Sequence, residues 1–164
     1  MTTENGLAWQ LAKYRDYHHD HRNVLTHVVG IPLIVLSITT LLAPWQLPLP
    51  GTAVPLSLVA AVLAAGWYLS LDLKLGLLMT ALLALFVVAG AQIASISTAV
   101  WLGGGIAMFV VGWVFQLVGH KFEGRKPAFV DDLRSFLVGP LFLVVEGLFA
   151  LGLMKGLRRE VETR

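Results

Sequence analysis

Long apolar runs separated by short polar segments dominate the chain. Four runs without a formal charge cover residues 24–43, 54–71, 75–94 and 98–118, and a fifth apolar run covers 136–154. About 20 apolar residues in a helix match the thickness of the hydrocarbon core of a bilayer. The pattern predicts an all-α, polytopic membrane bundle of four to five apolar helices, forming one integral membrane domain over residues 1–164.

An amphipathic stretch precedes the first run. Positions 7, 11, 14 and 18 fall on one stripe of a helix, which predicts a surface helix over residues 7–18. Asn23 is suited to cap the helix that follows. The gap between the second and third runs is so short that it predicts an antiparallel helical hairpin.

Lysine and arginine mark the cytoplasmic side. They gather before residue 23 and within 121–134, and four spans would bring both groups to the same side, so we expect the N-terminus and the histidine clusters in the cytoplasm. Pro140 interrupts the last run and leaves only positions 141–154 beyond it. A re-entrant or tilted interfacial helix over 136–154 would keep the basic C-terminal residues inside as well.

Composition excludes several classes of function. The chain is 57% hydrophobic and 13% charged, with a mean hydropathy of +0.76, as expected of a protein that contacts membrane lipid. Its formal net charge of +2 is too small to indicate nucleic-acid binding, and the absence of cysteine excludes thiolate chemistry. No cleavable signal peptide is predicted. The expected location is the inner membrane in a bacterium or the endoplasmic reticulum in a eukaryote.

The five histidines occupy two membrane-edge clusters. His18, His19, His21 and His27 precede or begin the first run, and His120 ends the fourth. A break at residues 19–22 would let Tyr14 with His18, and Asn23 with His27, point into one pocket from two helices. His19 and His21 are interpreted as solvated or in contact with lipid headgroups.

Carboxylates accompany both clusters. His120 and Glu123 are three residues apart on one helix, a spacing at which both can bind one metal ion, and two histidines with a carboxylate are typical of oxygen-activating Fe(II) sites. Asp72 and Glu146 are further acids at or within apolar runs, where ionisable groups are usually functional. Asp72 is equally consistent with an interfacial pair with Lys74, and Glu146 with a protonated or paired buried acid.

Three motifs carry a resemblance to a known family. They are Tyr14-x3-His18-x4-Asn23-x3-His27 with Gly30-Ile31-Pro32, Trp67-Tyr68-x3-Asp72, and Gln116-x2-Gly119-His120 leading to Glu123-x-Arg125-x-Pro127-Ala128. In this order they resemble the small membrane proteins that include the fungal 2-hydroxy fatty acid dioxygenase. The last run, with Pro140 and Glu146, resembles the final segment of that family.

The resemblance implies an Fe(II)-dependent dioxygenase that uses O2 to shorten a 2-hydroxy long-chain fatty acid by one carbon. It implies His18, His27 and His120 as metal ligands, with Glu123 or Asp72 as a possible carboxylate ligand. Tyr14, Asn23 and Tyr68 would donate hydrogen bonds or orient the ligands. Arg125 and Lys126 are membrane-side anchors or, alternatively, cations that bind the substrate carboxylate.

Two alternatives stay open. A non-enzymatic membrane protein that binds lipid or metal would use the same histidines, although a transporter usually places its polar groups near the bilayer midplane. A zinc-dependent lipid hydrolase would use the same ligands without redox chemistry.

Overall fold

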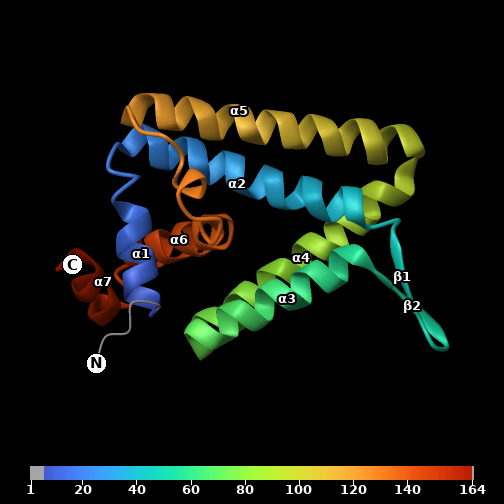
Figure 1. Cartoon of the computed structure of the whole chain (residues 1–164), viewed down its shortest axis with the longest axis horizontal. Helices are drawn as coiled ribbons and strands as arrows, with labels where there is room; N and C mark the ends of the chain where they lie inside the picture. The colour runs from blue at the N-terminus through green and yellow to red at the C-terminus, as the bar shows by residue number, and fades with distance from the viewer. Residues whose placement is uncertain (1–5, 164) are drawn as a thin grey trace. The chain divides into compact units, whose positions relative to one another are not determined.

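Seven α-helices make up most of residues 6–163, the part of the chain that this computed structural model describes. The helices form two compact units (Figure 1). One unit holds the described residues up to Ile31 together with those from Val114 onward, and the other is Pro32–Trp113. Both boundaries lie inside long helices, so the chain passes from one unit to the other without a loop.

Helix α1 (Leu7–Arg15) is shorter than the predicted surface helix 7–18. Its end is tight, because the amides of Tyr17 and His18 donate to carbonyls only three residues back, those of Tyr14 and Arg15. Carbonyl groups in the last turn of a helix need outside donors. The His18 ring is one such donor, since its Nδ1 lies 2.8 Å from the Tyr14 carbonyl oxygen.

Helix α2 (His21–Leu42) begins three residues earlier than the sequence predicts. The Asp20 carboxylate accepts a hydrogen bond from the Arg22 amide at 2.8 Å, so Asp20 rather than Asn23 serves the helix start. Asn23 is fully buried inside the first turns. The predicted cap at Asn23 is therefore wrong, and its side chain is available for other contacts.

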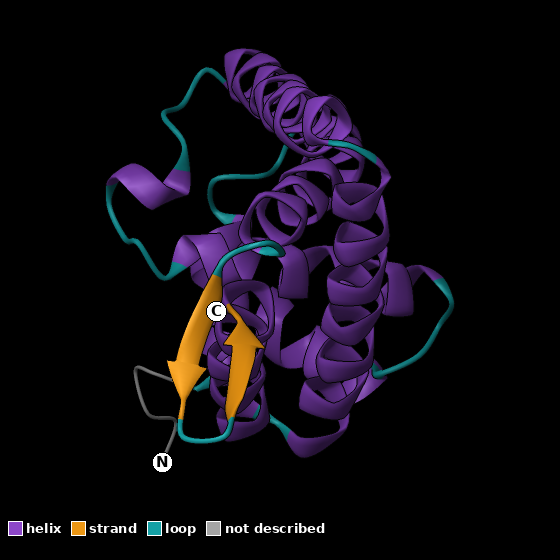
Figure 2. Ribbon diagram, turned by 90° about the vertical axis from the view of Figure 1, so that its right-hand side faces the viewer, coloured by secondary structure: helices purple, strands orange, loops and turns teal. Residues whose placement is uncertain are grey.

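The proline-rich segment after α2 is a β-hairpin, an element that the hydropathy pattern does not predict. Strands β1 (Gln46–Leu49) and β2 (Thr52–Pro55) pair antiparallel, with Leu49 opposite Thr52 (Figure 2). Gly51 takes a φ of +79° in the turn, a conformation that glycine adopts without strain. Hydropathy alone missed these strands because both are short and largely exposed.

Helices α3 (Leu56–Leu71) and α4 (Leu73–Ile96) form the predicted antiparallel hairpin and lie side by side in Figure 1. Asp72 is the single residue between them, in extended conformation, and its carboxylate accepts a hydrogen bond from the Leu75 amide at 2.9 Å. Gly76 allows the close approach, because a Cβ at this position would lie 2.6 Å from the Leu69 Cα.

One turn of π-helix, η1 (Val100–Gly104), leads into α5 (Gly105–Glu123). Trp101 in this turn donates from its indole nitrogen to the Leu41 carbonyl at 3.3 Å, which ties the start of the run to the end of α2. Residues 124–134 then form a polar connector that contains the short 3-10 helix η2 (Ala128–Val130).

The last apolar run contains α6 (Ser135–Ala150) and a break. Gly152 and Met154 take positive φ values of 74° and 54°, and α7 (Lys155–Glu162) continues at 116° to α6. Such a bent pair is a broken span or a re-entrant loop. Both helices pack on α1.

Three helical segments of the described chain are long and apolar enough to cross a membrane, namely His21–Leu42, Leu73–Ile96 and Val100–Glu123. Helix α3 is shorter, and α6 with α7 would add one more span if the bent pair is taken as one. Large apolar side chains point outward along these helices, such as Leu63 at 70% exposure. An apolar exterior of this extent is typical of helices in lipid, and it confirms the predicted all-α membrane bundle.

Candidate metal centre

His18 is held in place from two sides. It lies three residues beyond the end of α1, and its Nδ1 must donate to the Tyr14 carbonyl, because a carbonyl oxygen only accepts. The Tyr14 ring stacks on the His18 ring with centroids 4.1 Å apart and planes 11° apart. The other ring nitrogen, Nε2, is therefore fixed in direction and left with a lone pair.

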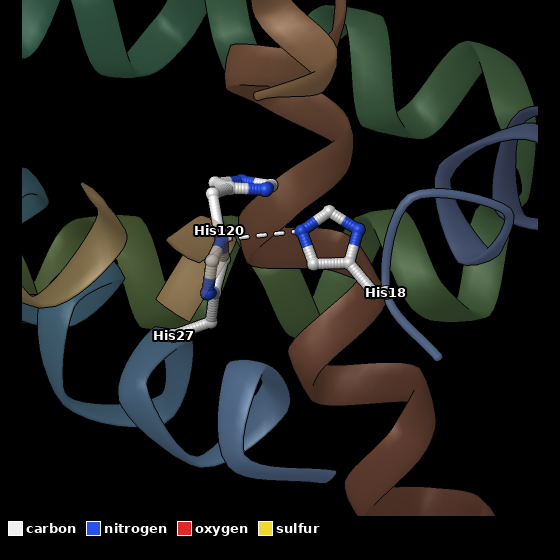
Figure 3. A group of neighbouring side chains, drawn as sticks. All are labelled: His18, His27 and His120. Carbon is white, nitrogen blue, oxygen red and sulfur yellow. Dashed lines mark hydrogen bonds between the residues drawn. The ribbon is translucent and has the colours of Figure 1, made fainter. Parts of the chain in front are cut away.

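His27 repeats the same arrangement on α2. Its Nδ1 donates to the Asn23 carbonyl, four residues earlier, at 2.9 Å. This bond fixes the tautomer, so the Nε2 of His27 also carries a lone pair. The Nε2 atoms of His18 and His27 lie only 3.1 Å apart (Figure 3). Two lone pairs repel at this distance, so the pair requires a proton or a metal cation between the rings.

His120 completes the group from α5. Its ring centroid lies 5.1 Å from that of His18 and 5.0 Å from that of His27. One nitrogen from each ring can be chosen so that all three lie within 4.8 Å of one another. The Nδ1 of His120 is buried and has no hydrogen-bond partner. The three rings converge from the α1–α2 loop, α2 and α5 (Figure 3).

Burial favours metal over proton at this histidine triad, His18, His27 and His120. Their exposed fractions are 4%, 2% and 6%. Loss of hydration lowers the pKa of His18 to about 4, so the ring is neutral at pH 7, the form that binds metals. Three neutral imidazoles suit iron, zinc, copper or nickel. The residues present thus fit a transition-metal ion.

Glu123 lies next to the triad but is not part of the metal-binding group. Its two oxygens accept hydrogen bonds from the amides of His19 and Asp20, both at 2.9 Å. One of them also accepts from the Asn23 side chain at 3.0 Å. The carboxylate therefore ties the loop that carries His18 to the start of α2 and the end of α5.

Gly119 sets the distance between the two helices that carry His27 and His120. A Cβ at this position would come within contact distance of Thr26 Oγ1 and Asn23 Oδ1 and would lie 3.2 Å from the His27 Nδ1. Only glycine lets the α5 backbone pass this close to α2. A glycine directly before a predicted metal ligand indicates a close helix contact. The sequence interpretation included Gly119 in a motif but gave it no structural role.

Helix α6 closes the apolar side of the triad. The Phe142 ring lies 5.8 Å from His18 and 5.1 Å from Tyr14 by centroids. Gly139 makes room for the Tyr14 hydroxyl, which would lie 3.0 Å from a Cβ at position 139. Burial raises the pKa of Tyr14, so its hydroxyl stays protonated. The sequence interpretation missed Phe142, for which no spacing signal exists.

The remaining predicted residues have other neighbours. Arg125 donates to the Asp16 carbonyl at 2.7 Å, and the Lys126 ammonium pairs with Asp131 at 2.6 Å. Tyr68 is buried and Asp72 caps α4, both in the Pro32–Trp113 unit. Their roles at the metal stay predictions.

The two outlying histidines differ from the triad in their exposure. His19 and His21 have exposed side chains, in keeping with their interpretation as solvated residues. Glu146 lies half-buried on α6 beside a hollow of about 240 Å³ that Arg15 and Arg158 also line.

Comparison with known proteins identifies the family of the chain. The model of the family described as 2-hydroxy-palmitic acid dioxygenase Mpo1-like matches residues 5–151. The 2-hydroxy-palmitic acid dioxygenase MPO1 of Saccharomyces cerevisiae is 36% identical over 160 residues, covering 95% of this chain and 87% of the yeast protein. No solved structure matches significantly. The family resemblance is confirmed, and the chain belongs to the Mpo1-like family.

Proposed function

We propose that this protein is an Fe(II)-dependent dioxygenase that shortens 2-hydroxy fatty acids by one carbon. The observation that carries the proposal is the pair of Nε2 atoms of His18 and His27, which face each other at 3.1 Å while both Nδ1 atoms lie against backbone carbonyls. A neutral pair of this kind has no stable hydrogen bond of its own. A metal ion held by these two rings and His120 removes the conflict.

Iron is favoured among the metals by the relative. The yeast protein is named a dioxygenase, and a dioxygenase needs a centre that activates O2. Ferrous iron bound by the triad would supply O2 activation and a position for the oxygens of the substrate. Zinc fits the same imidazoles but lacks this redox chemistry.

The neighbouring residues position the ligands rather than react. Tyr14 fixes His18 through its carbonyl and its stacked ring. Asn23 fixes His27 through its carbonyl, and Glu123 holds the intervening loop. We assign Glu123 to this positioning role and not to the metal, because its oxygens already accept three hydrogen bonds.

A position at the edge of a membrane suits a fatty acid substrate. A fatty acid carries its reactive carbon beside a charged head, and His27 and His120 stand near the ends of two spans whose outer faces are apolar. The head can reach the triad while the chain stays among apolar side chains. By the charge rule, this end of the spans faces the cytoplasm.

Metal content and turnover test the proposal together. The protein is purified without O2 in detergent, its iron and zinc are quantified, and 2-hydroxypalmitic acid is added with O2. Wild type should contain iron and yield the acid one carbon shorter. His27→Ala and His120→Ala should each lower metal affinity by more than the roughly 10–100-fold that loss of a ligand-orienting residue costs, and abolish product, because each removes a ligand. His21→Ala, which removes an exposed histidine, is the matched control.

Each outcome has a clear meaning. Iron and product in wild type and in His21→Ala, with both lost in the two triad variants, support the proposal. Zinc with no O2-dependent product would favour a hydrolase. A wild-type protein without bound metal would contradict the proposal altogether.

A further inference from the structure

Gln116 carries a buried amide nitrogen for which the described chain offers no acceptor. It lies on α5 one turn before His120, with 7% exposure, and its Nε2 has no hydrogen-bond partner. An unpaired buried donor destabilises a protein, and this one sits in a segment apolar enough to cross a membrane. An apolar side chain of the same size would fit the segment better.

Two other unpaired polar atoms lie nearby, and both have an explanation. The Asn23 Oδ1 packs against the backbone of Gly119, where a Cβ would collide with it. His120 belongs to the triad, where its imidazole has a metal to bind. Within residues 6–163, the Gln116 Nε2 is then a buried donor near the triad that has no assigned partner.

Helix α5 places the Gln116 amide on the side of the triad where the acyl chain of a fatty acid would lie. Residues four apart share a helix face, and the rise between them is about 6 Å. Since α5 ends at Glu123, Gln116 lies deeper in the apolar segment than His120. A fatty acid with its carboxyl group at the triad would lead its chain along this helix face, and the Gln116 side chain, one turn away, is long enough to extend back toward the second carbon.

We propose that Gln116 selects the 2-hydroxyl group of the substrate, its amide Nε2 donating a hydrogen bond to the hydroxyl oxygen. The assignment rests on the proposed function and deepens it. A 2-hydroxy acid pairs the donor, whereas an unsubstituted fatty acid leaves it buried and unpaired. Sites built to hydrogen-bond a hydroxyl reject analogues that lack it, for this reason.

Binding without turnover tests the assignment. Wild type, Gln116→Met and Gln92→Met are purified without O2, and their metal content is measured. Gln92 is an exposed amide on the apolar helix α4 and serves as the matched control. The Kd values for 2-hydroxypalmitate and palmitate are then measured by displacement of a fluorescent fatty acid. A ratio of two Kd values in one preparation does not depend on the fraction that is folded.

Gln116→Met should weaken binding of 2-hydroxypalmitate by about tenfold and leave palmitate nearly unchanged. It should keep its metal and melt at or above the temperature of wild type, because an unpaired donor is removed. Gln92→Met should keep the wild-type Kd ratio. A structural role for Gln116 would instead lower the melting temperature and weaken both acids equally.

The results separate this assignment from the proposed function. Suppose that the wild-type protein turns over substrate and that Gln116→Met has the wild-type ratio of the Kd values for palmitate and 2-hydroxypalmitate. This result overturns the role of Gln116 alone. Equal weakening of both acids also overturns it. A wild-type protein that binds neither acid overturns the proposed function, and this is seen before any variant is compared.

Discussion

The two halves of α2 both bury polar side chains, and they use them differently. In the half from Ser37 to Thr40, each buried hydroxyl donates to a carbonyl three or four residues back in the same helix, as Thr40 does to Leu36 at 2.7 Å. In the half from Asn23 to His27, polar atoms reach other elements, namely Glu123 on α5 and His18 beyond α1.

The difference follows from the side chains themselves. A hydroxyl has one proton, and the helix can accept it locally. An imidazole has two nitrogens, and the helix can satisfy only one of them, as the Asn23 carbonyl does for His27. The second nitrogen needs a partner from elsewhere. Burial of a polar residue in a membrane helix therefore indicates function only when an atom is left that the helix cannot pair.

Among substitutions that test the difference between the two halves of α2, Gly119→Ala should have the largest effect on bound metal. Gly119→Ala would press a methyl group against Thr26, Asn23 and His27 and push α5 away from α2. We expect the protein to lose most of its bound metal, because the triad no longer closes, and to lose about 1–3 kcal/mol of unfolding free energy through overpacking. Metal content and thermal unfolding in detergent measure both effects.

Gly90→Ala is the matched control for that experiment. Its Cβ would lie 2.7 Å from Thr39 and Thr40, in the half of α2 with locally paired hydroxyls. A similar loss of stability is expected there, with metal content per folded protein unchanged. Equal metal loss in both variants would mean that general loosening of the helices, and not the triad geometry, determines binding.

Glu123 should have the next largest effect. Glu123→Gln replaces an oxygen that accepts from the loop amides by an amino group, which cannot accept, and it removes the negative charge. The loop that carries His18 should loosen, and metal affinity should fall by about 10–100-fold, the range found for residues that orient ligands. Titration of the metal-free protein with Fe(II) under exclusion of O2 gives the affinity.

Asp72→Asn is the comparison variant for Glu123→Gln, because Asp72 is the other carboxylate proposed as a metal ligand. Asparagine caps a helix about as well as aspartate, so α4 should keep its start and the metal affinity should not change. A large loss of affinity in Asp72→Asn, with none in Glu123→Gln, would instead make Asp72 the carboxylate ligand that the sequence also allowed.

Hydropathy located the long helices because a span must be apolar over its whole length, and α2, α4 and α5 occupy the expected runs. The ends of elements depend on single hydrogen bonds, such as those that stop α1 at Arg15 and start α2 at His21, and hydropathy does not register them. The β1–β2 hairpin escaped prediction because both strands are short and largely exposed.

The site was predictable in pairs and not as a whole. Helical spacing placed Asn23 with His27, and His120 with Glu123, on shared faces. It could not decide whether Glu123 binds metal or backbone amides, because both depend on the path of the loop at residues 16–20. Contact between residues about 100 positions apart came only from the family resemblance in the sequence and from the packing in the structure.

The smallest loss of stability is expected from substitution of a surface ion pair that joins two elements. Lys13 on α1 pairs with Asp132 in the connector at 2.8 Å, with side chains 39% and 20% exposed. The Lys13 ammonium and the Arg134 amide hold the pKa of Asp132 below its ordinary value. Exposed ion pairs contribute little, so Asp132→Asn should cost about 0.2–1 kcal/mol of unfolding free energy at pH 7.

The pH dependence of that cost has a definite sign. Because the pKa of Asp132 is lowered in the folded protein, its stabilisation is present above the ordinary pKa of about 4 and is lost as the pH falls through the lowered value. Melting temperatures of wild type and Asp132→Asn, measured between pH 7 and pH 3, should therefore converge at the acid end, and high salt should narrow the gap at pH 7. A gap that persists at acid pH would mean that the carboxylate is not what stabilises the contact. Polar contacts between elements at the surface would then contribute to the stability of this fold through packing as well as through charge.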